Sequence, residues 1–125
     1  MTIEKALDLA DQLKPNMMSR QVKIGFLNEI DQLIWNELVM THEHTEEEET
    51  KPEYDIDTDE GTELIVPTPY DMLYVYWLMA RIDHLNQEID KYNNDRALFD
   101  NAYEQASDMW TLTRMPIQKT REFRL

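Results

Sequence analysis

The chain contains no cysteine and only two glycines, Gly25 and Gly61. Without cysteine it cannot form a disulfide, a thiolate metal site or a cysteine nucleophile. Two isolated glycines cannot build a glycine-rich phosphate loop, and the sequence also lacks a nucleophile elbow and a His-Glu-x-x-His zinc motif. Its many carboxylates lie in polar surroundings that do not tune a pKa for acid–base catalysis. We therefore expect a protein that is not an enzyme and carries no cofactor.

Long hydrophobic runs are also missing. The longest apolar run, residues 72–80, is far below the roughly 20 residues that span a bilayer. Residues 1–5 lack the charged and then apolar pattern of a signal peptide. We expect no membrane partner, and a location in the cytosol or in a particle.

Positive charge is scarce, because 12 Lys and Arg residues oppose 26 Asp and Glu residues and leave a net charge of −14. Such a chain repels phosphate, so nucleic acid is not expected as a direct partner. The charge is uneven: residues 41–67 form an acidic segment, whereas residues 114–125 form a basic tail. Complementary ends of this kind favour head-to-tail contact with another subunit or another protein.

Two amphipathic helices are predicted in the first third of the chain. Apolar residues recur at helical spacing over residues 2–13, and Pro15 ends this pattern. Ser19 is a favourable N-cap for a second helix that extends to about Met40. Residues 41–67 lose the helical period, so we expect a solvated acidic loop that includes a short β-hairpin or extended arm.

A long aromatic helix is predicted after this loop. Thr68 is placed to cap it, and Pro69 suits its first position. A helix that continued unbroken to Pro116 would be about 70 Å long, whereas a compact domain of this size is about 36 Å across. We therefore predict a break at Asn93–Asp95, with a fourth helix that starts at Asp95 and ends before Pro116. If no break exists, the helix protrudes and the protein is built to assemble.

The expected fold class is mainly α. At 125 residues the chain fits one domain with a single core. We expect a small bundle of three to four helices, with the hairpin or extended arm inserted before the long aromatic helix.

The aromatic helix is apolar on every side over residues 72–80. A helix of this kind is normally buried on every side, but a bundle of three or four helices gives limited shelter. Its aromatic side chains either fill the core or face a neighbouring subunit. The candidates for a subunit contact are Tyr70, Tyr74, Tyr76 and Trp77.

Two groups of side chains invite comparison with metal sites, and we expect neither to hold a metal. Asp55, Asp57 and Asp59 alternate as in a calcium-binding loop, but the glycine comes one residue late and a valine stands where that loop needs a glutamate. His42 and His44 lie in a polar run without a third ordered ligand.

A family resemblance is carried by the order of features in the second half of the chain. An apolar strand-like run precedes a proline-flanked helix start, an aromatic helix, an acidic and asparagine-rich junction, and a last amphipathic helix. In this sequence the features are Glu63-Leu64-Ile65-Val66, Thr68-Pro69, the aromatic residues 70–77, Glu88-x-x-x-Tyr92-Asn93-Asn94 and the helix that ends at Met115-Pro116. This order resembles the head–tail connector (adaptor) proteins of tailed bacteriophages.

The resemblance implies a virion structural protein of the neck, assembled in the host cytoplasm. Many copies would form a ring between the portal protein and the tail or stopper protein, and DNA would pass through the channel without specific binding. The basic C-terminal tail would dock on the portal. The residues concerned are Arg114, Ile117, Lys119, Arg121, Phe123, Arg124 and Leu125.

The glutamate run Glu46–Glu49 is longer than the resemblance requires and supports an alternative function. An acidic protein can mimic DNA and inhibit a host nucleic-acid-binding protein. A mimic needs carboxylates spaced like phosphates on a rigid surface, whereas the densest acids here lie in a predicted loop. The connector is therefore the preferred interpretation.

Overall fold

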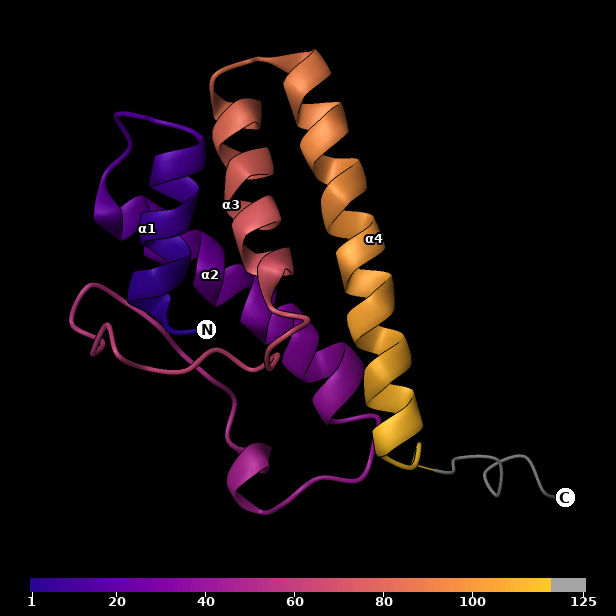
Figure 1. Ribbon diagram of the computed structural model, residues 1–125. Helices are drawn as coiled ribbons and strands as arrows, with labels where there is room; N and C mark the ends of the chain where they lie inside the picture. The colour runs from indigo at the N-terminus through magenta and orange to yellow at the C-terminus, as the bar shows by residue number, and fades with distance from the viewer. Residues whose placement is uncertain (118–125) are drawn as a thin grey trace, which may run out of the picture.

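A computed structural model describes residues 1–117, and it is a bundle of four α-helices with an inserted arm (Figure 1). The mainly helical fold class predicted from the sequence is confirmed. The described residues contain two isolated β-bridges and no β-strand. The elements in chain order are α1 (Ile3–Leu13), α2 (Arg20–Ile34), the π-turn η1 (Trp35–Val39), the 3-10 turn η2 (Glu47–Glu49), α3 (Met72–Leu85) and α4 (Ile89–Thr113).

The first two helices begin and end close to their predicted positions, because their start signals are local. The Thr2 hydroxyl accepts a hydrogen bond from the Lys5 amide (3.1 Å), and the Ser19 hydroxyl accepts one from the Val22 amide (3.2 Å). Each helix buries one apolar stripe, with Ile24, Leu27, Ile30 and Ile34 on α2 and Ile3, Ala6, Leu7 and Ala10 on α1.

The predicted start of the aromatic helix at Thr68 and Pro69 is wrong, because α3 begins at Met72. The two side chains that could cap an earlier start make other contacts. The Thr68 hydroxyl donates to the Asp71 carboxylate (2.9 Å), and that carboxylate lies 3.1 Å from the amino group of Met1. No side chain caps α3.

The predicted break at Asn93–Asp95 is also wrong, because α4 runs unbroken through these residues. The helices separate at 86–88, where Gln87 has a left-handed φ of 59°. The Glu88 amide donates to the Asp83 carbonyl (3.0 Å), and the Gln87 amide donates to the His84 carbonyl (3.1 Å). This pattern is a Schellman stop, which usually has glycine at the left-handed position. The sequence gives no stop signal there because the residue is glutamine.

The break makes α3 and α4 an antiparallel pair that lie side by side (Figure 1). α4 is about 37 Å long at 1.5 Å per residue, which matches the expected width of the domain. Lys14, at the end of α1, ties the pair to the rest of the bundle: its ammonium contacts the Asp83 carboxylate on α3 and lies 2.7 Å from that of Asp95 on α4. Asp83 is completely buried.

Residues 41–71 form the extended arm, and the alternative β-hairpin is not present. The arm crosses the start of α1, where the Leu64 amide donates to the Met1 carbonyl (2.9 Å) and the Ile3 amide donates to the Thr62 carbonyl (3.1 Å). Leu64 and Val66 are buried against the helices. An isolated hairpin is marginal in water, whereas the arm here is held by packing on the bundle.

One buried carboxylate fixes the arm to both central helices. Asp31 on α2 is 0% exposed and accepts hydrogen bonds from the Tyr54 hydroxyl (2.6 Å), the Tyr74 hydroxyl (2.5 Å) and the Ile65 amide (3.1 Å). Burial raises the pKa of Asp31. Burial, and then the charge of the Asp31 carboxylate, raise the pKa of Tyr54 and of Tyr74. Because Tyr74 is 0% exposed, its predicted contact with a neighbouring subunit is wrong for this fold.

Candidate interaction surfaces

Within residues 1–117, no group of three or more His, Asp or Glu side chains is placed to hold a metal ion. The three aspartates that resemble a calcium loop do not converge. Asp55 accepts from the Asp57 amide and Asp59 from the Gly61 amide, each at 2.9 Å, so these two carboxylates close local turns.

The sequence context of the two histidines predicted a solvated loop, but the structure holds both side chains in defined contacts. His42 is buried, and its Nδ1 lies 2.8 Å from the Leu38 carbonyl while its Nε2 lies 3.2 Å from the Thr111 hydroxyl. His44 lies with its Nδ1 2.7 Å from the His42 carbonyl. These contacts join the end of η1 to the end of α4, so the pair has a structural role.

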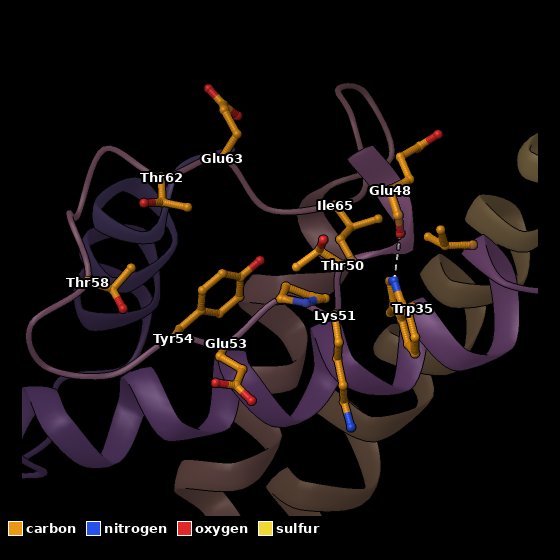
Figure 2. Close-up of a pocket in the computed structure, with 12 residues that line it drawn as sticks. Trp35, Glu48, Thr50, Lys51, Glu53, Tyr54, Thr58, Thr62, Glu63 and Ile65 are labelled. Carbon is orange, nitrogen blue, oxygen red and sulfur yellow. Dashed lines mark hydrogen bonds between the residues drawn. The ribbon is translucent and has the colours of Figure 1, made fainter. Parts of the chain in front are cut away.

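An apolar groove of about 510 Å³ lies between the arm and η1 (Figure 2). Trp35, Val39 and Ile65 provide its apolar lining, together with Tyr54 and Pro52 from the arm. The Trp35 indole nitrogen donates to the Glu48 carbonyl (2.8 Å), which fixes the indole against η2. The groove is therefore built from groups that other contacts hold in place.

The groove is bordered by more negative than positive charge. Glu48, Glu53 and Glu63 line it, against one cation, Lys51 (Figure 2). Glu63 and Glu53 are exposed to solvent, and Glu48 is half-buried. An apolar lining with carboxylates around it suits a ligand that carries both apolar and cationic side chains.

The base of the C-terminal tail is fixed beside this groove. The Arg114 guanidinium lies 2.9 Å from the Glu48 carboxylate and stacks on the Trp110 ring at 4.1 Å. The Glu43 amide donates to the Met115 carbonyl, and the Ile117 amide donates to the Thr41 carbonyl, both at 2.8 Å. These bonds place the chain from 115 to 117 antiparallel to residues 41–43.

Two of the predicted portal-docking residues can therefore be placed. Arg114 is occupied by contacts within the chain, and the Ile117 side chain is 38% exposed. The remaining five lie outside the described residues: Lys119, Arg121, Phe123, Arg124 and Leu125.

A second hollow, of about 270 Å³, lies between the start of α3 and the middle of α4. Tyr70 and Tyr76 line one wall, and both are half-buried. Trp77 points elsewhere, since its indole nitrogen donates to the Phe26 carbonyl (3.0 Å) and its ring lies 5.0 Å from that of Phe99. The other lining residues are Pro69, Met72, Leu98, Asn101, Ala102 and Gln105.

Sequence reasoning missed the part of this hollow that α4 provides. Leu98 is 40% exposed and Leu112 is 86% exposed, although both are large and apolar. With Ala102 and Met109 they recur at intervals of four, seven and three residues, which places a second apolar stripe on α4 beside the stripe that packs on α3. That spacing is the signal that could have identified the surface.

The positive charges of the described residues are largely neutralised. Of the Lys and Arg side chains in residues 1–117, only Lys5 and Lys51 have no carboxylate of the same residues within 4.0 Å. The outer surface is consequently dominated by carboxylates without a cation beside them.

The helices of the described part are too short or too polar to cross a membrane. The chain matches no known protein family, no curated protein and no solved structure.

Proposed function

We propose that this protein is a head–tail connector subunit that forms a ring between the portal protein and the tail machinery of a tailed bacteriophage. The observation that carries the proposal is the anchored base of the C-terminal tail at Arg114–Ile117, which shares no residue with the α3–α4 hollow. A ring subunit needs two different patches for its two neighbours, because a head-to-tail contact joins unlike patches, and it needs a further surface for the portal. The anchored tail and the hollow supply two of these surfaces.

The charge of the chain supports a passive role toward DNA. The net charge is −14, and the described cations are mostly paired, so residues 1–117 offer phosphate few free positive groups. A channel lined by such a surface does not grip a passing duplex. This agrees with a connector through which DNA moves without specific binding.

Counting copies in particles tests this function directly. We expect quantitative peptide mass spectrometry on purified virions to find about one copy of this chain for each portal subunit. Absence from virions, together with abundance in infected lysates, would exclude a neck component. That result would favour the alternative, an acidic mimic of DNA, which is supported by the exposed side chains of Glu46, Glu47 and Glu49 beside η2.

Removing residues 118–125 should abolish attachment to capsids that carry portal protein. The helical content measured by circular dichroism should stay within a few per cent, because every described contact of Arg114–Ile117 remains. Co-sedimentation of the purified chain with capsids measures attachment, and capsids without portal provide the background. Undiminished co-sedimentation of the truncated chain would refute tail docking.

The α3–α4 hollow should be the contact between neighbouring subunits. Leu98→Lys places a charge in this hollow and should lower the yield of rings on portal-bearing capsids at least tenfold. Ala97→Lys is the matched control, because Ala97 is the adjacent exposed residue of α4 and does not line the hollow. Negative-stain microscopy and sedimentation report ring formation. Equal ring yields for the two variants would show that the subunit contact lies elsewhere on the protein.

A further inference from the structure

The apolar groove beside Trp35 has no assigned occupant in the connector proposal. We propose that it is a peptide-binding site, and that in the free subunit it binds the C-terminal residues 118–125 of the same chain. The proposal concerns the isolated protein and does not rest on the proposed connector function.

The first argument is the position from which the tail departs. Arg114 contacts Glu48, which itself lines the groove, and the Ile117 amide is bonded to Thr41, two residues after the groove residue Val39. The chain from 115 to 117 runs antiparallel to residues 41–43 and so heads toward Val39. Eight further residues can reach about 28 Å when extended. The groove is therefore within reach of the tail.

The second argument is complementarity of charge and polarity. The tail sequence Gln-Lys-Thr-Arg-Glu-Phe-Arg-Leu carries Lys119, Arg121 and Arg124 against one glutamate, together with the apolar Phe123 and Leu125. The groove offers the exposed Glu53 carboxylate beside an apolar lining; its other two carboxylates, Glu48 and Glu63, already contact Arg114 and the Met1 amino group. In an extended peptide, residues 123 and 125 project to the same side. Two apolar side chains can thus enter the groove while a cation of the tail meets the Glu53 carboxylate.

A same-chain contact is favoured over binding between copies by tethering. A short tether holds its peptide at an effective concentration in the millimolar range. If the free peptide binds an empty groove with a Kd of about 0.1 mM, the attached tail occupies the groove about nine-tenths of the time. Free peptide should then bind the full chain about tenfold more weakly than a chain without its tail.

The test uses a fluorescein-labelled peptide with the sequence of residues 117–125 and the chain truncated after Ile117. Fluorescence anisotropy should show binding to the truncated chain and about tenfold weaker binding to the full chain. Absence of binding to the truncated chain, or equal binding to both chains, would overturn the proposal. Tail-dependent dimers of the full chain in sedimentation velocity would also overturn it, because they assign the groove to the tail of a second copy.

Two matched controls separate the groove from general attraction between a cationic peptide and an acidic protein. In the truncated chain, Glu53→Lys should weaken peptide binding at least fivefold, whereas Asp57→Lys, an equal charge change on the same arm outside the groove, should weaken it less than twofold. A peptide with alanine in place of Phe123 and Leu125 keeps every charge and should lose most of its affinity. If that peptide binds as well as the native one, the groove is not the site.

Failure of this proposal and failure of the connector function are distinguishable. The peptide measurements use the purified chain alone, whereas attachment and ring formation are measured on capsids. Circular dichroism of each variant confirms that the fold is retained.

Discussion

Asp31→Ala is expected to lower the free energy of unfolding by about 3 kcal/mol, one of the two largest effects of a single substitution that we predict. The substitution leaves the hydroxyls of Tyr54 and Tyr74 and the amide of Ile65 without their acceptor in the buried interior. Each unsatisfied buried donor costs about 1–3 kcal/mol. The loss stays below the sum of the three because removing the carboxylate also removes the cost of burying it.

Urea unfolding at pH 7, followed by circular dichroism, measures this change. Tyr54→Phe removes one donor and should cost about 1 kcal/mol, whereas Tyr74→Phe also removes the acceptor of the buried Val66 amide (2.8 Å) and should cost about 2 kcal/mol. Asp57→Ala is the surface control and should change stability by less than about 0.5 kcal/mol, because the Asp57 carboxylate is exposed and accepts no hydrogen bond in the described part of the chain. A loss below 1 kcal/mol for Asp31→Ala would mean that the arm is not held by this carboxylate.

Lys14→Met should lower the free energy of unfolding at pH 7 by about 3–5 kcal/mol. It removes the cation between two carboxylates, and the side chain of Asp83 is 0% exposed while that of Asp95 is 7% exposed. Removing one partner of a buried ion pair leaves an uncompensated charge in the interior. Methionine preserves the apolar stem, so the loss reports the charge more than the packing. Lys5→Met, on the exposed side of α1, should have little effect.

The loss in the free energy of unfolding caused by Lys14→Met should depend on pH, and the surroundings of Asp83 determine the direction of this dependence. Burial, and then the neighbouring Asp95 carboxylate, raise the pKa of Asp83 to about 6, although Lys14 acts against both. The folded state therefore holds this proton more tightly than the unfolded state, whose carboxyl has a pKa near 3.8. The tighter binding of this proton stabilises the fold fully below about pH 4, and the stabilisation is lost as pH rises toward 6.

Two pH values are enough to test this sign. Without Lys14 the pKa of Asp83 should rise further, so the variant should lose less stability at pH 5 than at pH 7. Urea unfolding of the native chain and the variant at both pH values measures the difference. An equal loss at the two pH values would show that removing Lys14 does not raise the pKa of Asp83 in the folded state.

The helices with strong local signals were predictable from the sequence. Ser19 caps α2 as expected, and the periodic apolar residues identify the buried faces of α1 and α2. The absence of a helical period over residues 41–67 correctly indicated an arm. These features depend on residues that are neighbours in the chain, so the local sequence is sufficient to predict them.

The helix break was not predictable in the same way. Asn93 and Asn94 are poor helix formers, and Asp95 is a good cap, yet all three lie within α4. The ion pair between Asp95 and Lys14 contributes to holding α4 through that region, and the partners are far apart in sequence. Conversely, the chain turns at Gln87, whose left-handed backbone is the kind of conformation that glycine or asparagine usually signals.

The sequence by itself determined the helical class, the acidic arm, the basic tail and the absence of any cysteine chemistry, because composition and periodicity are properties of the chain. Only the tertiary structure decided which apolar side chains remain at the surface. It buries Tyr74 on Asp31, turns Trp77 toward Phe26, and leaves Tyr70 and Tyr76 beside α4. The physical reason is that burial depends on which elements meet, and that is set by contacts between residues distant in sequence.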